Sequence, residues 1–157
     1  MEVDFALLAD RADIVNGKLY LLGGAFDSLY AVKVPVKHQA MTLAMRFLFS
    51  PAECDQMYKL EVRLIDADGK KVLAVPGQFS LKRSPKSEKG YRTAFLTAIN
   101  FFNTQLSTFG DYSFEIFVNG HGVKSVPLRL IQMEPPKEEP PKPKEEEKSP
   151  PPPPAAA

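Results

Sequence analysis

The stretch Gly110-Asp-Tyr-Ser-Phe-Glu-Ile-Phe-Val-Asn-Gly120 decides the fold that we expect. Apolar side chains occupy every second position within it: Tyr112, Phe114, Ile116 and Val118. A period of two places successive side chains on opposite faces of an extended strand. The closing Asn119-Gly120 pair tolerates the positive φ angles that a tight hairpin turn requires. The stretch therefore predicts a β-strand with one buried face, followed by a hairpin.

The same alternation recurs along most of the chain, and Asn16-Gly17 and Asp68-Gly69 supply further hairpin turns. We expect about eight strands, near residues 3–10, 17–31, 39–49, 57–66, 70–82, 92–101, 111–118 and 123–132. Helix is expected to be minor, with one turn near residues 51–54 or around residues 103–107. The pattern predicts an all-β protein.

Several of these strands carry apolar residues on both faces, which a single sheet would leave in water. We therefore expect an antiparallel two-sheet β-sandwich of immunoglobulin-like type. Tyr112 follows a loop and enters a late strand, which is typical of a tyrosine corner. The antibody pattern is incomplete, because Phe114 stands where the second cysteine would fall and the chain has no Trp.

The composition divides the 157 residues into a β-sandwich domain, 1–133, and a tail, 134–157. The tail is rich in Pro, Glu and Lys and has no aromatic or branched aliphatic residue, so it predicts disorder. Lys137, Pro140 and Pro143 match the loose K-x-x-P-x-x-P form of polyproline ligands. Because such matches arise easily in Pro-rich segments, we favour a spacer over a docking motif.

The overall charge and the single cysteine limit the expected partners and compartment. A formal net charge of +1 gives no general attraction to nucleic acid or to an anionic membrane. Cys54 is the only cysteine, and the N-terminal stretch is acidic where a secretory signal would be basic. No apolar run reaches the roughly 18 residues of a membrane-spanning helix. We expect a cytoplasmic protein without a membrane span.

The glycine pair Gly23-Gly24 raises the question of a phosphate-binding loop. Such a loop needs a helix start after the glycines, with a Lys or a third Gly at fixed spacing. The residues that follow, Ala25 to Ala31, continue as strand. Because glycines inside a strand usually mark a bulge, we interpret the pair as a bend in a long strand.

Other sequence features that suggest chemistry also have simpler interpretations. Asp66 and Asp68 resemble the start of a calcium loop, but Gly77 stands where the closing carboxylate belongs, so we expect a hairpin turn. Cys54 lies in an expected loop as an accessible thiol, and nothing places His38 or His121 beside it. We predict no catalytic pair, no metal site and no cofactor. The remaining candidate acids are interpreted as solvent-facing or turn residues: Asp10, Asp13, Asp27 and Glu61.

The most basic stretch runs from Lys82 to Arg92 and joins two expected strands. Lys82 and Arg83, with Tyr91 as a stacking surface, are candidates for contact with phosphates or with an acidic partner. Basic loops are common and the domain is barely charged, so a solvated connection is the favoured interpretation.

The chain resembles a family of small bacterial proteins of unknown function. The resemblance is carried by the first strand, Val3 to Asp10, by the Asn16 to Asp27 hairpin and by the Gly110 to Gly120 strand. The resemblance covers the body and not the tail. It implies a bacterial source and an immunoglobulin-like sandwich. It implies no catalytic residue.

Three function classes follow from the sequence. The leading hypothesis is a non-catalytic module that binds another protein through an exposed edge strand or a loop end. Pro127, in the last expected strand, favours an edge there. The alternative is a small-ligand or carbohydrate-binding sandwich, with three candidate aromatic contacts: Tyr20, Tyr30 and Phe117. The third class, an enzyme, has no signature in the sequence.

Overall fold

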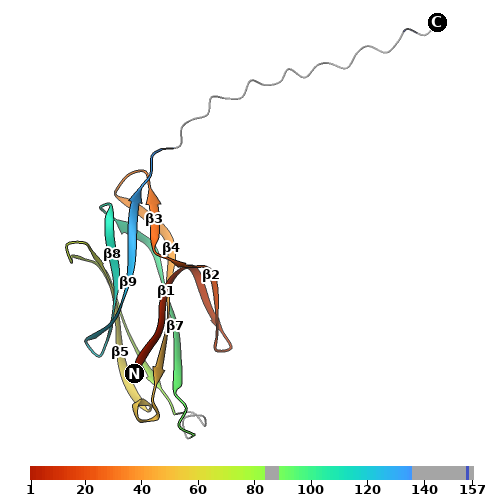
Figure 1. Ribbon diagram of the computed structural model, residues 1–157, viewed down its shortest axis with the longest axis vertical. Coiled ribbons are helices and arrows are strands. Elements are labelled where there is room, and N and C mark those ends of the chain that lie inside the picture. Colours follow the sequence, from red (N-terminus) through yellow and green to blue (C-terminus); the bar gives the residue numbers. More distant parts are fainter. Residues whose placement is uncertain (84–88, 136–154, 156–157) are drawn as a thin grey trace.

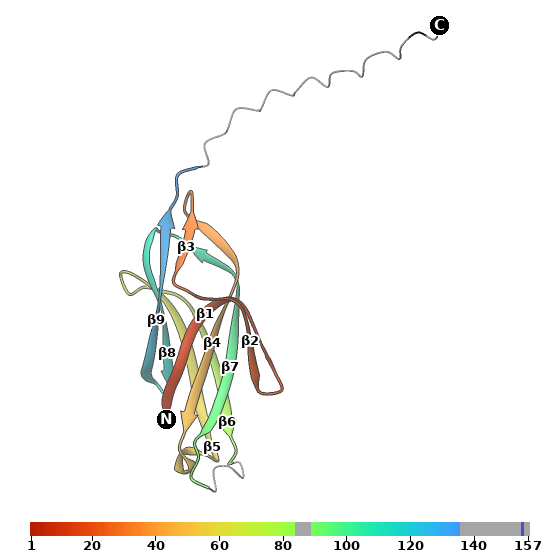
Figure 2. The ribbon, with the colours of Figure 1, turned by 45° about the vertical axis from the view of Figure 1, so that its right-hand side comes forward.

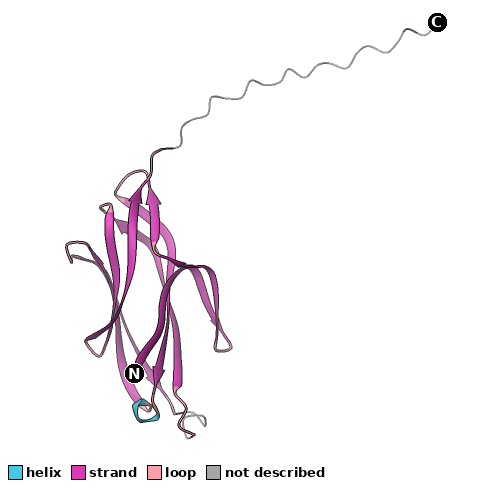
Figure 3. Cartoon of the chain, in the orientation of Figure 1, coloured by secondary structure: helices cyan, strands magenta, loops and turns pink. Residues whose placement is uncertain are grey.

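The computed structural model describes residues 1–83, 89–135 and 155 (Figure 1). The described part contains nine strands: β1 (Glu2–Val15), β2 (Lys18–Phe26), β3 (Ser28–Ala31), β4 (Val36–Phe49), β5 (Gln56–Asp66), β6 (Lys71–Leu81), β7 (Thr93–Leu106), β8 (Gly110–Val118) and β9 (His121–Gln132). A single 3-10 turn, η1 (Pro51–Glu53), follows β4 (Figure 3). The all-β prediction is confirmed.

The strands form two sheets that pack face to face (Figure 2). The first sheet has the order β2-β1-β4-β7, and the second has the order β3-β9-β8-β5-β6. All neighbours are antiparallel except β3 and β9, which run parallel. The two-sheet β-sandwich is therefore confirmed.

The core lies between the sheets. It is filled by the apolar residues that occupy every second position of the strands. Leu43 and Phe47 of β4 face Leu64 of β5 and Phe114 of β8, and all four side chains are fully buried. An aromatic cluster fills the end of the sandwich near η1: Phe47, Phe49, Tyr58, Phe79 and Phe95. Burial of these rings supplies much of the hydrophobic stabilisation.

The strand expected over residues 17–31 is two strands. β2 ends at Phe26 beside β1, and β3 begins at Ser28 beside β9 in the other sheet. Asp27 marks the crossing, and its carbonyl oxygen accepts a hydrogen bond from the N–H of Arg129 at 2.7 Å. The prediction of one long bent strand is therefore wrong, because the chain passes from one sheet to the other at this point.

The glycine pair forms a β-bulge, as predicted. Leu8 pairs with Phe26 and Ala9 pairs with Gly24, so Ala25 is the extra residue on β2. Gly23 and Ala25 have φ values of 61° and 65°. A Cβ on Gly23 would lie 2.1 Å from Oδ2 of Asp10, so the glycine leaves room for that carboxylate.

The tyrosine corner is also present. The Tyr112 hydroxyl donates to the carbonyl oxygen of Thr108 at 2.8 Å and accepts from the Thr108 N–H at 3.1 Å. The loop that it fastens carries the chain from β7 in the first sheet to β8 in the second.

Two local predictions have different outcomes. The turn near residues 51–54 is confirmed as η1. The alternative turn around residues 103–107 is wrong, because β7 continues to Leu106 and pairs with β4 as far as Val36. Asn103 adopts φ 51° inside that strand, which locally reverses the alternation of its side chains.

The edge assignment of the last strand is wrong as well. β9 lies between β3 and β8. Pro127 is nevertheless compatible with this position, because β3 begins only opposite Arg129, two residues further along. The missing N–H of the proline lies beyond the end of the short partner strand.

Candidate functional site

The edge strands differ in how they are protected against pairing with another chain. β3 has four residues, and β6 contains Pro76 at its middle and begins with Lys71. β2 is broken by the positive φ angles at Gly23 and Ala25. Short length, proline, lysine and bulges are the devices that natural proteins use to block edge-to-edge association. β7 has none of them over its first ten residues.

β7 is a 14-residue edge strand without a charged residue or a proline, and it pairs only with β4. Its outward side chains alternate with the core residues and form one row: Ala94, Leu96, Ala98, Asn100 and Phe102. Phe102 ends this row and is 69 % exposed. We call the outer edge of Thr93–Phe102 with this row the β7 edge.

The start of β7 is packed against the second sheet by stacked aromatic rings. The ring of Phe95 stacks on Phe79 of β6 with centroids 3.9 Å apart and planes at 7°. Phe79 in turn stacks on Tyr58 at 5.3 Å. An ordered strand loses little conformational entropy when a second strand pairs with it, which favours binding.

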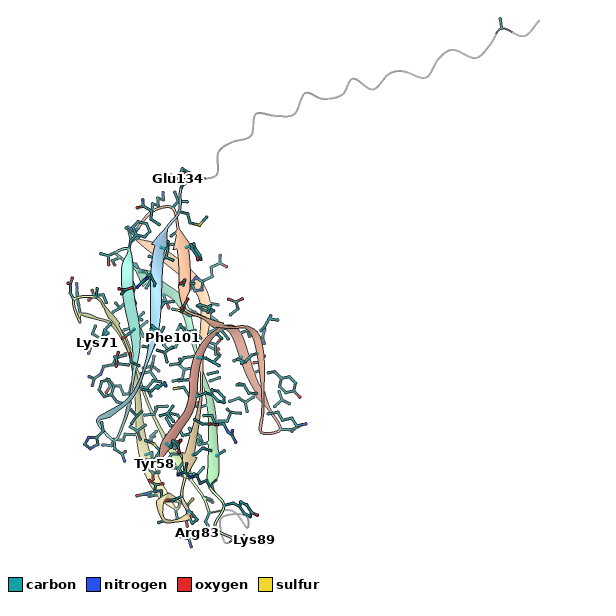
Figure 4. The ribbon with its side chains drawn as sticks, viewed as in Figure 1. Tyr58, Lys71, Arg83, Lys89, Phe101 and Glu134 are labelled. Carbon is teal, nitrogen blue, oxygen red and sulfur yellow. The ribbon has the colours of Figure 1, made fainter. Side chains whose placement is uncertain are left out.

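Beyond this aromatic contact the two sheets separate, and a groove of about 800 Å³ opens between the end of the β5–β6 hairpin and the second half of β7. Figure 4 places Lys71 at the outer end of that hairpin and Phe101 near the middle of the body. Hydroxyl, amide and charged side chains line the groove, among them Asp68, Asn103 and Thr104, together with Phe102. This size is typical of a small-ligand site.

Two buried polar atoms lie at this end of the sandwich without a hydrogen-bond partner among the described residues. They are Nε2 of His38 and Oγ1 of Thr104, which belong to directly opposed residues of β4 and β7. Thr104 lines the groove, and His38 lines a second cavity of about 480 Å³ together with Asp10 and Tyr30. An unpartnered buried hydroxyl is costly unless a water or a ligand satisfies it.

The described residues of the basic stretch lie at the opposite end, where Figure 4 shows Arg83 and Lys89. Arg83 is tied to η1, because its N–H donates to Asp55 at 2.9 Å and its guanidinium donates to the carbonyl oxygen of Pro51 at 3.2 Å. Lys82 and Tyr91 are exposed. The structure brings these three candidates to one end but uses Arg83 for an internal contact. Lys137, Pro140 and Pro143 lie outside the described residues.

The cysteine differs from expectation. Cys54 is buried, and its thiol lies 3.5 Å from the carbonyl oxygen of Ser50, so it is no accessible loop thiol. His38 is at the start of β4, whereas Cys54 follows the end of that strand. At about 3.3 Å per residue, the strand separates the two by over 30 Å. His121 is exposed at the start of β9, directly after the last hairpin turn.

The candidate acids were interpreted as solvent-facing or turn residues; Asp10, Asp13 and Asp27 are exposed, and Glu61 is half-buried. Asp13 pairs with Arg11 at 3.0 Å, and Asp27 accepts from the Ser28 hydroxyl at 2.8 Å. Glu61 binds Arg63 through both carboxylate oxygens, which lowers the pKa of Glu61.

The Asp66 turn is a hairpin connection, as expected. The Asp66 carboxylate accepts the N–H groups of Asp68 and Lys70 at 3.1 and 2.8 Å, and Gly69 adopts φ 77°. No group of three His, Cys, Asp or Glu side chains in the described part of the chain is arranged to hold a metal ion.

The three candidate aromatic contacts do not share one surface. Tyr20 is on β2 and Tyr30 on β3, and both are exposed. Phe117 is on β8, where the guanidinium of Arg63 covers its ring at 4.2 Å. Phe102, which no motif in the sequence marks, is an exposed aromatic beside the groove.

The strongest electrostatic perturbation lies at η1. The N-terminal amino group of Met1 contacts Oε1 of Glu53, and the N–H and hydroxyl of Ser50 both donate to Oε2 at 2.8 Å. These contacts lower the pKa of Glu53 from 4.5 to about 2, the amino group having the largest effect. The arrangement closes the turn and is structural.

The family model of a family of unknown function, DUF6941, matches residues 4–131. The chain belongs to this family. The match covers all the strands except the ends of β1 and β9. It agrees with the resemblance to an uncharacterised family that the sequence indicated. No curated protein matches the chain. Within residues 1–83, 89–135 and 155, no helix is long and apolar enough to cross a membrane.

Proposed function

We propose that this protein is a non-catalytic module that binds a polypeptide strand along the β7 edge. The observation that carries the proposal is the long, uncharged, proline-free edge strand in a sandwich whose other edges are protected. A strand that pairs there receives backbone hydrogen bonds from β7, while the outward row supplies side-chain contacts.

Site-specific photo-crosslinking tests the proposal. A photoreactive phenylalanine replaces Phe102 in one form of the protein and Tyr30 in the control form, in the native host. Both positions carry exposed aromatic side chains, 69 % and 63 % respectively, but Tyr30 lies on the short strand β3. We expect discrete protein adducts from position 102 only. Equal labelling at both positions, or none at 102, would contradict the proposal.

A second candidate function is small-ligand binding in the groove beside β7. The unpartnered, buried hydroxyl of Thr104 and the amide side chain of Asn103 favour a polar ligand such as a carbohydrate, with Phe102 as an apolar contact. Ligand-observed NMR with a panel of monosaccharides tests it. Signals that persist in a Thr104→Val, Phe102→Ser double variant would place binding elsewhere.

We also propose an immunoglobulin-like type, a cytoplasmic location and a bacterial source for this protein. An immunoglobulin-like type is supported by the packing of two sheets and by the Tyr112 corner. A cytoplasmic location is supported by the single, reduced Cys54. The family resemblance supports a bacterial source, and we propose that the tail serves as a spacer for the module.

A further inference from the structure

The β7 edge has a composition that suits pairing with itself. Between Thr93 and Leu106 there is no charge, so two copies of the strand can lie side by side without opposing like charges. The edge therefore carries no electrostatic barrier against a second copy of this chain. An edge selected for a charged partner would be expected to carry the complementary charge.

Two copies of the outward row also fit each other when they are paired antiparallel with Asn100 at the centre. If a two-fold axis passes beside Asn100, the antiparallel register places Phe102 of one copy opposite Ala98 of the other. The one ring in the row then covers an alanine, one of its two smallest side chains. The same register places Asn100 opposite Asn100 of the second copy.

Asn100 has hydrogen-bonding capacity left for such a contact. Its Oδ1 accepts from the Thr42 hydroxyl at 2.7 Å, which fixes the side chain on the outer face of the sheet. Its amide N–H groups have no hydrogen-bond partner within the described residues, and Asn100 is exposed. Two such amides related by a two-fold axis donate to each other's oxygens, because each oxygen has a second lone pair.

The proline-rich tail is a poorer occupant of this edge. Ten of the fifteen prolines lie within residues 134–157. A proline has no N–H to donate to a strand ladder.

We propose that β7 pairs with β7 of a second copy of this chain, antiparallel and about a two-fold axis at Asn100. This inference rests on the proposed function and names the partner of the same edge. A closed two-fold contact uses one patch twice and does not propagate into fibres. A single strand pair buries a small interface, so the dimer dissociates on dilution.

Sedimentation velocity of the full-length chain over a wide concentration range tests the pairing. We expect a reversible dimer for the natural sequence. Asn100→Lys and Asn100→Glu each place like charges opposite each other and should weaken the dimer about tenfold or more. An equimolar mixture of the two variants should recover the dimer, because the register centred on position 100 places the new lysine of one copy beside the new glutamate of the other. Ala74→Lys on β6, an exposed position of another edge, is the control and should dimerise normally.

A natural chain that stays monomeric, or Asn100 variants that dimerise like the control, would overturn the self-pairing. The photo-crosslinking experiment separates this failure from failure of the proposed function. An adduct at position 102 with another protein, from a monomeric chain, overturns only the inference drawn here. No adduct and no dimer together overturn both.

Discussion

The Tyr112 hydroxyl donates a hydrogen bond of 2.8 Å to the carbonyl oxygen of Thr108, across the loop that joins the two sheets. Tyr112 is buried, and its ring packs within the core. The bond therefore fixes the crossing point of the chain from β7 to β8. It also holds one end of β7, the strand on which both proposals rest.

Tyr112→Phe keeps the ring and removes the hydroxyl. Because two Thr108 backbone groups lose their partner, we expect a loss of about 1–2 kcal/mol in the free energy of unfolding. Urea denaturation measures it. Tyr30→Phe, at an exposed position, is the control and should change stability by less than about 0.5 kcal/mol. Equal effects in the two variants would mean that the corner contributes nothing.

Gly23→Ala tests the bulge in β2. The substitution adds a Cβ where Asp10 Oδ2 lies and retains a positive φ, so we expect a loss of about 1–2 kcal/mol. Gly17→Ala is the matched control, since Gly17 has φ 71° and nothing within 4 Å of its Cβ position. The difference between the two variants isolates the contact with Asp10. Combining Gly23→Ala with Asp10→Ser should remove that difference, as thermal unfolding would report.

Thr104→Val and Thr42→Val should have opposite effects. Both threonines are buried, but Thr42 donates to Asn100, whereas Thr104 Oγ1 has no partner among the described residues. We expect Thr42→Val to cost about 1 kcal/mol and Thr104→Val to stabilise by a similar amount. Denaturant titration decides the signs. A destabilising Thr104→Val would show that a bound water or ligand satisfies that hydroxyl.

Stability should fall in acid as Glu53 is protonated. The amino group of Met1 and the Ser50 donors lower its pKa from 4.5 to about 2 in the folded state. A lowered pKa means that the contribution is complete above pH 4.5 and is lost as the pH falls towards 2. Glu53→Gln should lack this part of the pH dependence of the unfolding free energy. NMR titration of the Glu53 carboxyl carbon measures the pKa directly, and an ordinary value would contradict the contacts described.

Local sequence patterns were sufficient for several elements of this fold. Alternation of side chains predicted the buried face of β8, the residues before Tyr112 predicted the corner, and Gly23-Gly24 predicted the bulge. Each of these depends on backbone conformation or on contacts within a few residues. Of the two positions at which a helical turn was expected, residues 51–54 form one, η1.

The sequence by itself determined that this is an all-β protein with two packed sheets, because the spacing of apolar residues specifies which face of each strand is buried. Only the tertiary structure decided that the chain changes sheets at Asp27, that β9 is an inner strand, and that β7 lies at an edge. The neighbours of a strand depend on pairing between residues far apart in the chain, and alternation within one strand contains no information about them. The β7 edge and its candidate role follow from that non-local arrangement.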